Sequence, residues 1–128
     1  MYSIVESTKP FDVTANALEA SVKKNGFGVL HIHNLGATLR SKGIDYAEEC
    51  KVFEVCNPQQ ASKVLAIDVR LNMALPCRIS VYTEGGKVKV SYIKPVEMLS
   101  ALSNDAALVN IAREVESAMI NILNAAIA

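Results

Sequence analysis

The sequence predicts an α+β fold, in which a single mixed or antiparallel sheet of about five strands has helices packed on one face. Three observations predict it: segments of alternating polarity are interleaved with segments of helical periodicity, a double-glycine turn joins the last two strands, and the longest helix comes last. The expected element order is β-α-β-α-β-α-β-β-α-α. A chain of 128 residues is long enough for one domain, 1–128, and too short for two.

Strands and helices are expected to alternate in the first half of the chain. The first helix has apolar residues in steps of four, three and four, and Gly26 follows it as a left-handed stop. The third helix begins at Asn57-Pro58, because asparagine is a favoured N-cap and proline suits the first helical position. The strands are expected at about 2–6, 27–33 and 51–56, and the helices at about 12–24, 37–42 and 58–67.

The second half is expected to hold a hairpin followed by two helices. A connection over 68–76 leads into strands at 77–83 and 88–93, joined by a turn in which Gly85 and Gly86 tolerate positive φ. A short helix runs from Pro95 to about Leu102, and a long helix covers about 105–126, capped by Ser103 or Asn104. The last turns of this helix are more apolar than one buried stripe requires, which favours packing on a second subunit through Ile122, Leu123, Ala126 and Ile127.

The composition excludes several classes of protein. Lys and Arg number 13 and Asp and Glu number 13, so the chain has no basic surplus for nucleic acid. Hydrophobic residues make up 51%, which excludes global disorder, yet no apolar run approaches the ~18 residues of a membrane span. The first residues do not resemble a secretory signal. Three cysteines cannot all pair, and reduced thiols predict a cytoplasmic protein.

Three stretches resemble the domain-of-unknown-function family 302, a family of small bacterial and archaeal proteins. The resemblance implies a single α+β domain and a homodimer, and it implies no established activity. The stretches are Gly26-Phe27-Gly28-Val29-Leu30; Cys56-Asn57-Pro58 with Ala61, Val64 and Leu65; and Leu75-Pro76-Cys77-Arg78 followed by Val81-Tyr82, Gly86-Lys87-Val88 and Pro95-Val96-Glu97-Met98-Leu99.

Two cysteines are the sharpest chemical feature. Cys56 ends a strand just before a helix N-terminus, where the helix dipole favours a thiolate and lowers the thiol pKa. Cys77 begins another strand after Pro76, and if the two strands are neighbours the thiols approach each other. A reversible disulfide, a persulfide or a two-thiolate metal site would then be available. The alternative is that both are small buried hydrophobes, which the phase of Cys77 with the following strand supports.

Other polar groups give weaker signals. The N–H groups at the start of the helix after Asn57 form an anion cradle with Lys63 and Arg78, unless Asn57 itself caps them. His31 and His33 lie on one face of a strand, but two ligands do not make a metal site and no metal is predicted. The remaining acidic cluster fits acid–base chemistry or, more simply, a solvated loop: Asp45, Glu48 and Glu49.

The sequence favours a non-enzymatic small-ligand-binding or accessory protein over an enzyme. No phosphate-binding, dinucleotide or serine-hydrolase motif is present, and no reaction or cofactor can be named. The alternatives are a thiol redox or sulfur-handling protein using the two cysteines, and a dimeric interaction module acting through the C-terminal helix. The expected partners are a small molecule and a second copy of the chain. The candidate ligand site combines Cys56, Asn57, Pro58, Cys77 and Arg78.

Overall fold

A computed structural model describes residues 1–128 and confirms the α+β class. The strands are β1 (Tyr2–Ser7), β2 (Gly28–Asn34), β3 (Cys50–Cys56), β4 (Cys77–Glu84) and β5 (Lys87–Ile93). The helices are α1 (Phe11–Lys24), α2 (Leu35–Ser41), α3 (Pro58–Ile67), the 3₁₀-helix η1 (Val69–Ala74), α4 (Pro95–Leu102) and α5 (Ala106–Ile127). All strand pairs are antiparallel, in the order β1-β5-β4-β3-β2.

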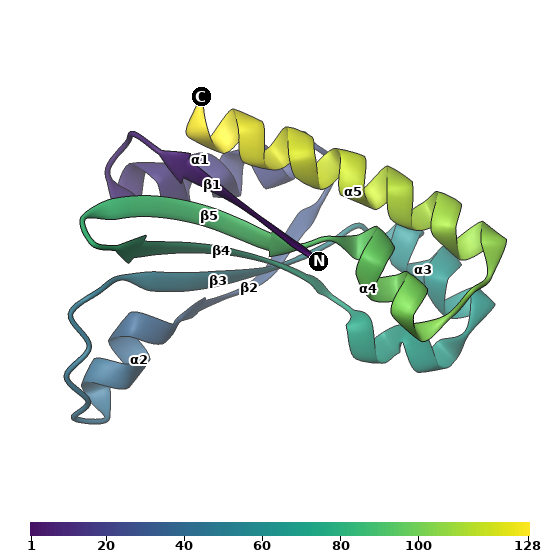
Figure 1. Ribbon diagram of the computed structural model, residues 1–128, viewed down its shortest axis with the longest axis horizontal. Coiled ribbons are helices and arrows are strands. Elements are labelled where there is room, and N and C mark those ends of the chain that lie inside the picture. The colour runs from purple at the N-terminus through teal and green to yellow at the C-terminus, as the bar shows by residue number, and fades with distance from the viewer.

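Helices α1 and α5 cover one face of this sheet (Figure 1). The periodic side chains of α1, including Leu18 and Val22, are fully buried against the inward residues of the strands. The two helices are also joined by a hydrogen bond, because Ser21 Oγ donates to the carbonyl oxygen of Ile122 over 2.9 Å. None of the helices is long and apolar enough to cross a membrane.

The last turns of α5 belong to this core. Ile122, Leu123 and Ala126 are each at most 2% exposed, and Ile127 packs beside them. The expectation that these side chains pack on a second subunit is therefore wrong, because the sheet and α1 of the same chain already cover them. The cap of α5 also differs from expectation, since the carboxylate of Asp105 accepts the N–H groups of the first turn.

A second, smaller apolar cluster lies beyond the end of the sheet, where α3, η1 and α4 gather around the first half of α5 (Figure 1). The expected connection over 68–76 contains η1, which begins where the Asp68 carboxylate accepts the Arg70 N–H at 3.0 Å. The buried members of the cluster are Val64, Leu71, Leu99, Leu108 and Ala112.

A β-bulge in β2 changes which side chains face the core. The pairing with β3 shifts between Val29 and His31, so Leu30 is an extra residue and is 60% exposed. As a result Val29 and Ile32 pack on the core, where simple alternation had placed Leu30 with Ile32. His31 and His33 lie on the opposite, uncovered face of the sheet, beside the outward residues of β3.

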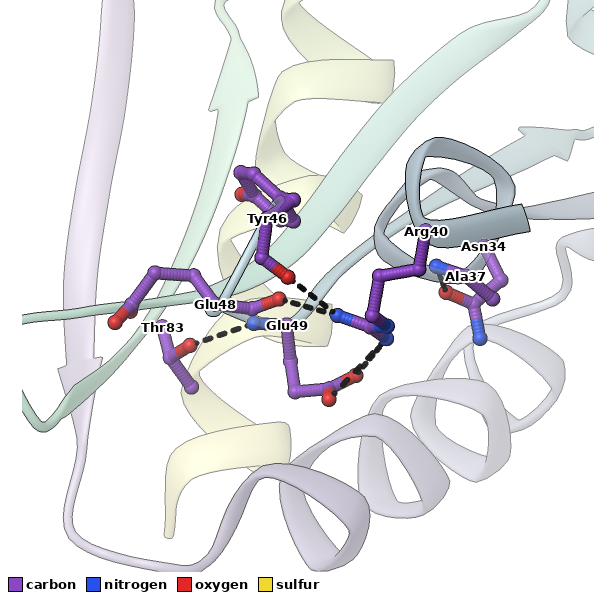
Figure 2. Close-up of polar contacts among 7 residues, drawn as sticks. All are labelled: Asn34, Ala37, Arg40, Tyr46, Glu48, Glu49 and Thr83. Atoms are coloured by element: carbon purple, nitrogen blue, oxygen red, sulfur yellow. Dashed lines mark hydrogen bonds and ion pairs between the residues drawn. The ribbon is translucent and has the colours of Figure 1, made fainter. Parts of the chain in front are cut away.

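The loop between α2 and β3 is braced by Arg40 (Figure 2). Its guanidinium donates to the carbonyl oxygens of Tyr46 and Glu48 at 3.1 and 3.0 Å and pairs with the Glu49 carboxylate at 3.4 Å. The Glu49 N–H in turn donates to Thr83 Oγ1 of β4 at 2.8 Å. The acidic residues of this loop therefore serve to anchor it, and the ion pair with Arg40 opposes a role for Glu49 as a base.

Candidate functional site

The two sequence motifs meet where β3 ends and β4 begins. Val55 of β3 pairs directly with Cys77 of β4, so Cys56 and Pro76 lie at the same end of the sheet. From this end α3 leaves β3 and η1 arrives at β4, while α4 follows the end of β5. The chain therefore brings three helices to one edge of the sheet, and an apolar hollow remains between them.

The hollow has a cavity volume of about 30 Å³, which is the space of roughly one water molecule or one small apolar group. Eleven of its fifteen lining residues are hydrophobic, and none carries a charge. They come from both apolar clusters and from the connection between them: Phe27, Val55, Cys56, Asn57, Gln60, Ala61, Val64, Ala74, Leu75, Pro76, Cys77, Pro95, Met98, Leu99 and Val115.

Two amide side chains supply the polar groups of the hollow. Asn57 Oδ1 accepts the N–H groups of Gln59 and Gln60 at 3.1 and 3.2 Å, and Asn57 Nδ2 donates to the carbonyl oxygen of Gly26 at 3.3 Å. The start of α3 is therefore capped by its own chain, and the anion cradle considered from the sequence is already filled. Gln60 Nε2 donates to Glu114 Oε2 at 2.9 Å, whereas Gln60 Oε1 is buried without a partner.

Both thiols of the hollow are in the protonated state at neutral pH. Burial raises the pKa of Cys77 to about 11, and the nearby Cys56 adds to this shift by disfavouring a second negative charge. Burial also raises the pKa of Cys56, so the expected lowering by the α3 dipole is wrong. The reason is that the apolar lining removes water from the thiol, and the cap by Asn57 occupies the N–H groups that would stabilise a thiolate.

The structure brings together only part of the predicted site. Cys56, Asn57 and Cys77 line the hollow, whereas Pro58 is exposed at the start of α3. Arg78 points to the opposite face of the sheet, since side chains alternate along β4, and its guanidinium lies 3.7 Å from Glu54.

The uncovered face of the sheet holds a separate polar cluster around Glu54. His33 Nε2 donates to Glu54 Oε1 at 2.9 Å, and the rings of His31 and His33 meet edge to face at 4.3 Å between centroids. The hydrogen bond from His33 lowers the pKa of Glu54, and Arg78 acts in the same direction. No group of three or more His, Cys, Asp or Glu side chains has the arrangement to hold a metal ion.

Comparison with known proteins places the chain in a family. The family model "Domain of unknown function DUF302" matches residues 3–126. The chain belongs to the DUF302 family. A solved structure, the uncharacterized conserved protein DUF302 from Bacillus stearothermophilus, is 35% identical with a TM-score of 0.91, covering 98% of this chain and 97% of that one. No curated protein matches the chain.

Sequence reasoning on this DUF302 chain missed several residues of the hollow. Met98 and Leu99 belong to a stretch that carried the family resemblance, but nothing in their spacing places them beside Cys56. Gln60 was considered only for its backbone N–H at the start of α3. Its side chain was identifiable as an exception, because it is a polar residue one position before the apolar Ala61 that faces inward.

Proposed function

We propose that this DUF302 domain binds a small, largely apolar ligand in the hollow and acts as a binding or accessory protein rather than as an enzyme. The convergence of Cys56, Asn57 and Cys77 on an uncharged hollow carries the proposal. Ligand sites in proteins are typically concave and mostly apolar, with a few polar groups that orient the ligand. The lining offers no carboxylate, imidazole or amine for acid–base catalysis, and its thiols resist ionisation.

The volume of the hollow limits what can enter it. About 30 Å³ is far below the roughly 300 Å³ of a typical drug-sized site, so a ligand is slim or inserts only one end. Met98 lines the hollow from α4, and its unbranched thioether chain is the side chain best able to move aside. A narrow apolar chain therefore suits the space better than a flat ring system does.

Xenon under pressure provides a test, because this gas binds apolar cavities without needing polar contacts. In amide NMR spectra we expect xenon to shift the signals of Val64 and Leu99. Ala61→Leu fills the hollow and should abolish these shifts, whereas Ala66→Leu, at an exposed position of the same helix, should leave them unchanged. Absence of xenon shifts around the hollow in the wild type would contradict the proposal.

A thiol function is the second candidate, because Cys56 and Cys77 line the same hollow. Their raised pKa values make both thiols slow nucleophiles at neutral pH, so a sulfur-containing ligand would be held rather than attacked. Rates of alkylation by iodoacetamide distinguish the candidates: rapid modification of Cys56 in the native protein favours the thiol function, and protection of both thiols opposes it. Three unpaired cysteines also favour our proposal of a cytoplasmic location.

We also propose a homodimer, formed through the uncovered face of the sheet. Tyr2, Ile4 and Ile93 lie on this face and are each at least 46% exposed. The same face pairs each sign of charge with the other, as in Glu6 with Lys87 at 3.5 Å, so a second copy related by a two-fold axis meets no excess of like charge. Sedimentation should show a dimer that Ile4→Glu dissociates and that Val13→Glu, an exposed control on α1, preserves. A monomeric wild type would refute this proposal.

A further inference from the structure

The unpartnered oxygen of Gln60 indicates which chemical class of ligand the hollow accepts. Gln60 Oε1 is buried and accepts no hydrogen bond from the chain. A buried acceptor without a donor is unfavourable, and such atoms in folded proteins are usually satisfied. Because Gln60 lines the hollow, a molecule bound there is in a position to supply the missing donor.

The orientation of the Gln60 amide is fixed by its neighbour on α5. An ionised carboxylate only accepts hydrogen bonds, so Glu114 requires the NH₂ end of the amide, which donates to it at 2.9 Å. The oxygen must then lie on the other side. The amide therefore offers the buried side an acceptor and no donor, and a ligand that only accepts hydrogen bonds gains nothing from it.

The rest of the lining excludes charged ligands. No Lys, Arg, His, Asp or Glu lines the hollow, and Arg78 lies on the other face of the sheet with Glu54. The thiols of Cys56 and Cys77 are neutral, since burial raises the pKa of each. A charged group placed here would lose its water without gaining a partner of opposite charge.

We propose that the hollow selects a neutral molecule with a slim apolar body and one hydroxyl group, an aliphatic alcohol, whose O–H donates to Gln60 Oε1. This inference deepens the proposed function and rests on it. Gln60 acts in the proposal as the residue that sets specificity, and the apolar lining supplies the rest of the binding free energy.

Two isomers provide the matched probes. 1-Hexanol and di-n-propyl ether contain the same atoms and similar apolar surface, but only the alcohol has an O–H donor. We expect the alcohol to bind about fivefold to tenfold more tightly than the ether, in titrations followed by the amide NMR signals of Val64 and Leu99. Hexanoate, which has the same chain length and a negative charge, should bind more weakly than the alcohol.

The variant Gln60→Leu removes the acceptor and keeps an apolar side chain. It should reduce the ratio of ether to alcohol dissociation constants to about one, as expected when the single hydrogen bond is lost. Gln59→Leu, at the exposed neighbouring position of α3, is the control and should keep the wild-type ratio. Gln60→Met, unbranched and of similar length, repeats the measurement if the leucine variant does not fold.

The outcomes separate the two proposals. Equal affinities for alcohol and ether in the wild type, or a preference that survives in Gln60→Leu, would overturn the alcohol specificity and leave the hollow as a binding site. Tighter binding of hexanoate than of hexanol would overturn the selection of neutral ligands. If no probe, xenon included, shifts the signals around the hollow, the proposed function fails, and with it the specificity that rests on it.

Discussion

The two apolar clusters of the domain differ in size and in what holds their elements in place. The larger contains fifteen buried residues between the sheet and helices α1 and α5, and the smaller contains five among α3, η1, α4 and the first half of α5. The hollow lies where they meet, since Val55 and Val115 come from the larger cluster and Val64 and Leu99 from the smaller. The candidate site is therefore rigid on one side and weakly held on the other.

The physical reason lies in the elements themselves. The strands of the larger cluster are joined by continuous ladders of backbone hydrogen bonds, and α1 and α5 are 14 and 22 residues long. In contrast α3 and α4 have 10 and 8 residues, and η1 has 6. Isolated helices shorter than ~12 residues are marginal in water, so these depend on their few buried side chains. We infer that a ligand enters by displacement of the small cluster.

The largest effect is expected from a truncation in the larger cluster. Leu18 is fully buried in α1, and Leu18→Ala should lower the free energy of unfolding by about 4 kcal/mol, toward the upper end of the range for such changes. The rigid sheet cannot collapse onto the space that the side chain leaves. Urea denaturation measures the loss, which should appear as one cooperative transition. A loss well below that of the next variant would contradict the comparison.

The same substitution in the smaller cluster should cost less and act locally. Leu71 of η1 is 2% exposed, and Leu71→Ala should lower the free energy of unfolding by about 2 to 3 kcal/mol, because short helices can close partly over the gap. Hydrogen exchange should accelerate in α3 and η1 while α1 and the central strands stay protected. Uniform acceleration across the domain would show that the two clusters open as one unit.

Cys77 reports how dry the hollow is at the boundary between the clusters. The folded state holds the proton of Cys77 up to about pH 11, whereas the unfolded chain releases it near 9.0. Stability is therefore unaffected below pH 9.0 and falls as pH rises from there to about 11, by about 2 kcal/mol. Urea denaturation of the wild type and of Cys77→Val through this window measures the difference. An identical alkaline loss in both, with Cys50→Val as the control, would indicate a hydrated hollow.

The sequence predicted the fold more completely than the site, and particular residues show why. The period of apolar residues in α1 and the glycines at 85 and 86 act locally, and the structure confirms both elements. The bulge at Leu30 was missed because it depends on pairing with β3, a contact between distant residues. The apolar end of α5 was read as a subunit surface because the second helix covering it, α1, is about a hundred residues away.

The site shows the same division. Cys56, Asn57 and Cys77 were placed correctly in the hollow because they sit at strand ends, which period and turn signals locate. Arg78, their neighbour in sequence, points away because alternation along a strand reverses the side of each successive residue. The Gln60 acceptor could not be identified at all from the sequence, because its orientation depends on Glu114, which is 54 residues away in the chain.

The smallest expected effect tests whether the helices of the small cluster depend on their caps more than α5 does. Asn57→Ala removes the acceptor of two N–H groups at the start of α3, and Asp105→Ala does the same at the start of α5. Each should lower the free energy of unfolding by about 1 kcal/mol. In α3 the loss should accelerate hydrogen exchange along the whole helix, since only Val64 anchors it as a fully buried residue. In α5 it should be confined to the first turn, because seven buried residues hold the rest. Equal spreading in both helices would mean that the small cluster is as rigid as the large one, and a ligand would then need another way in.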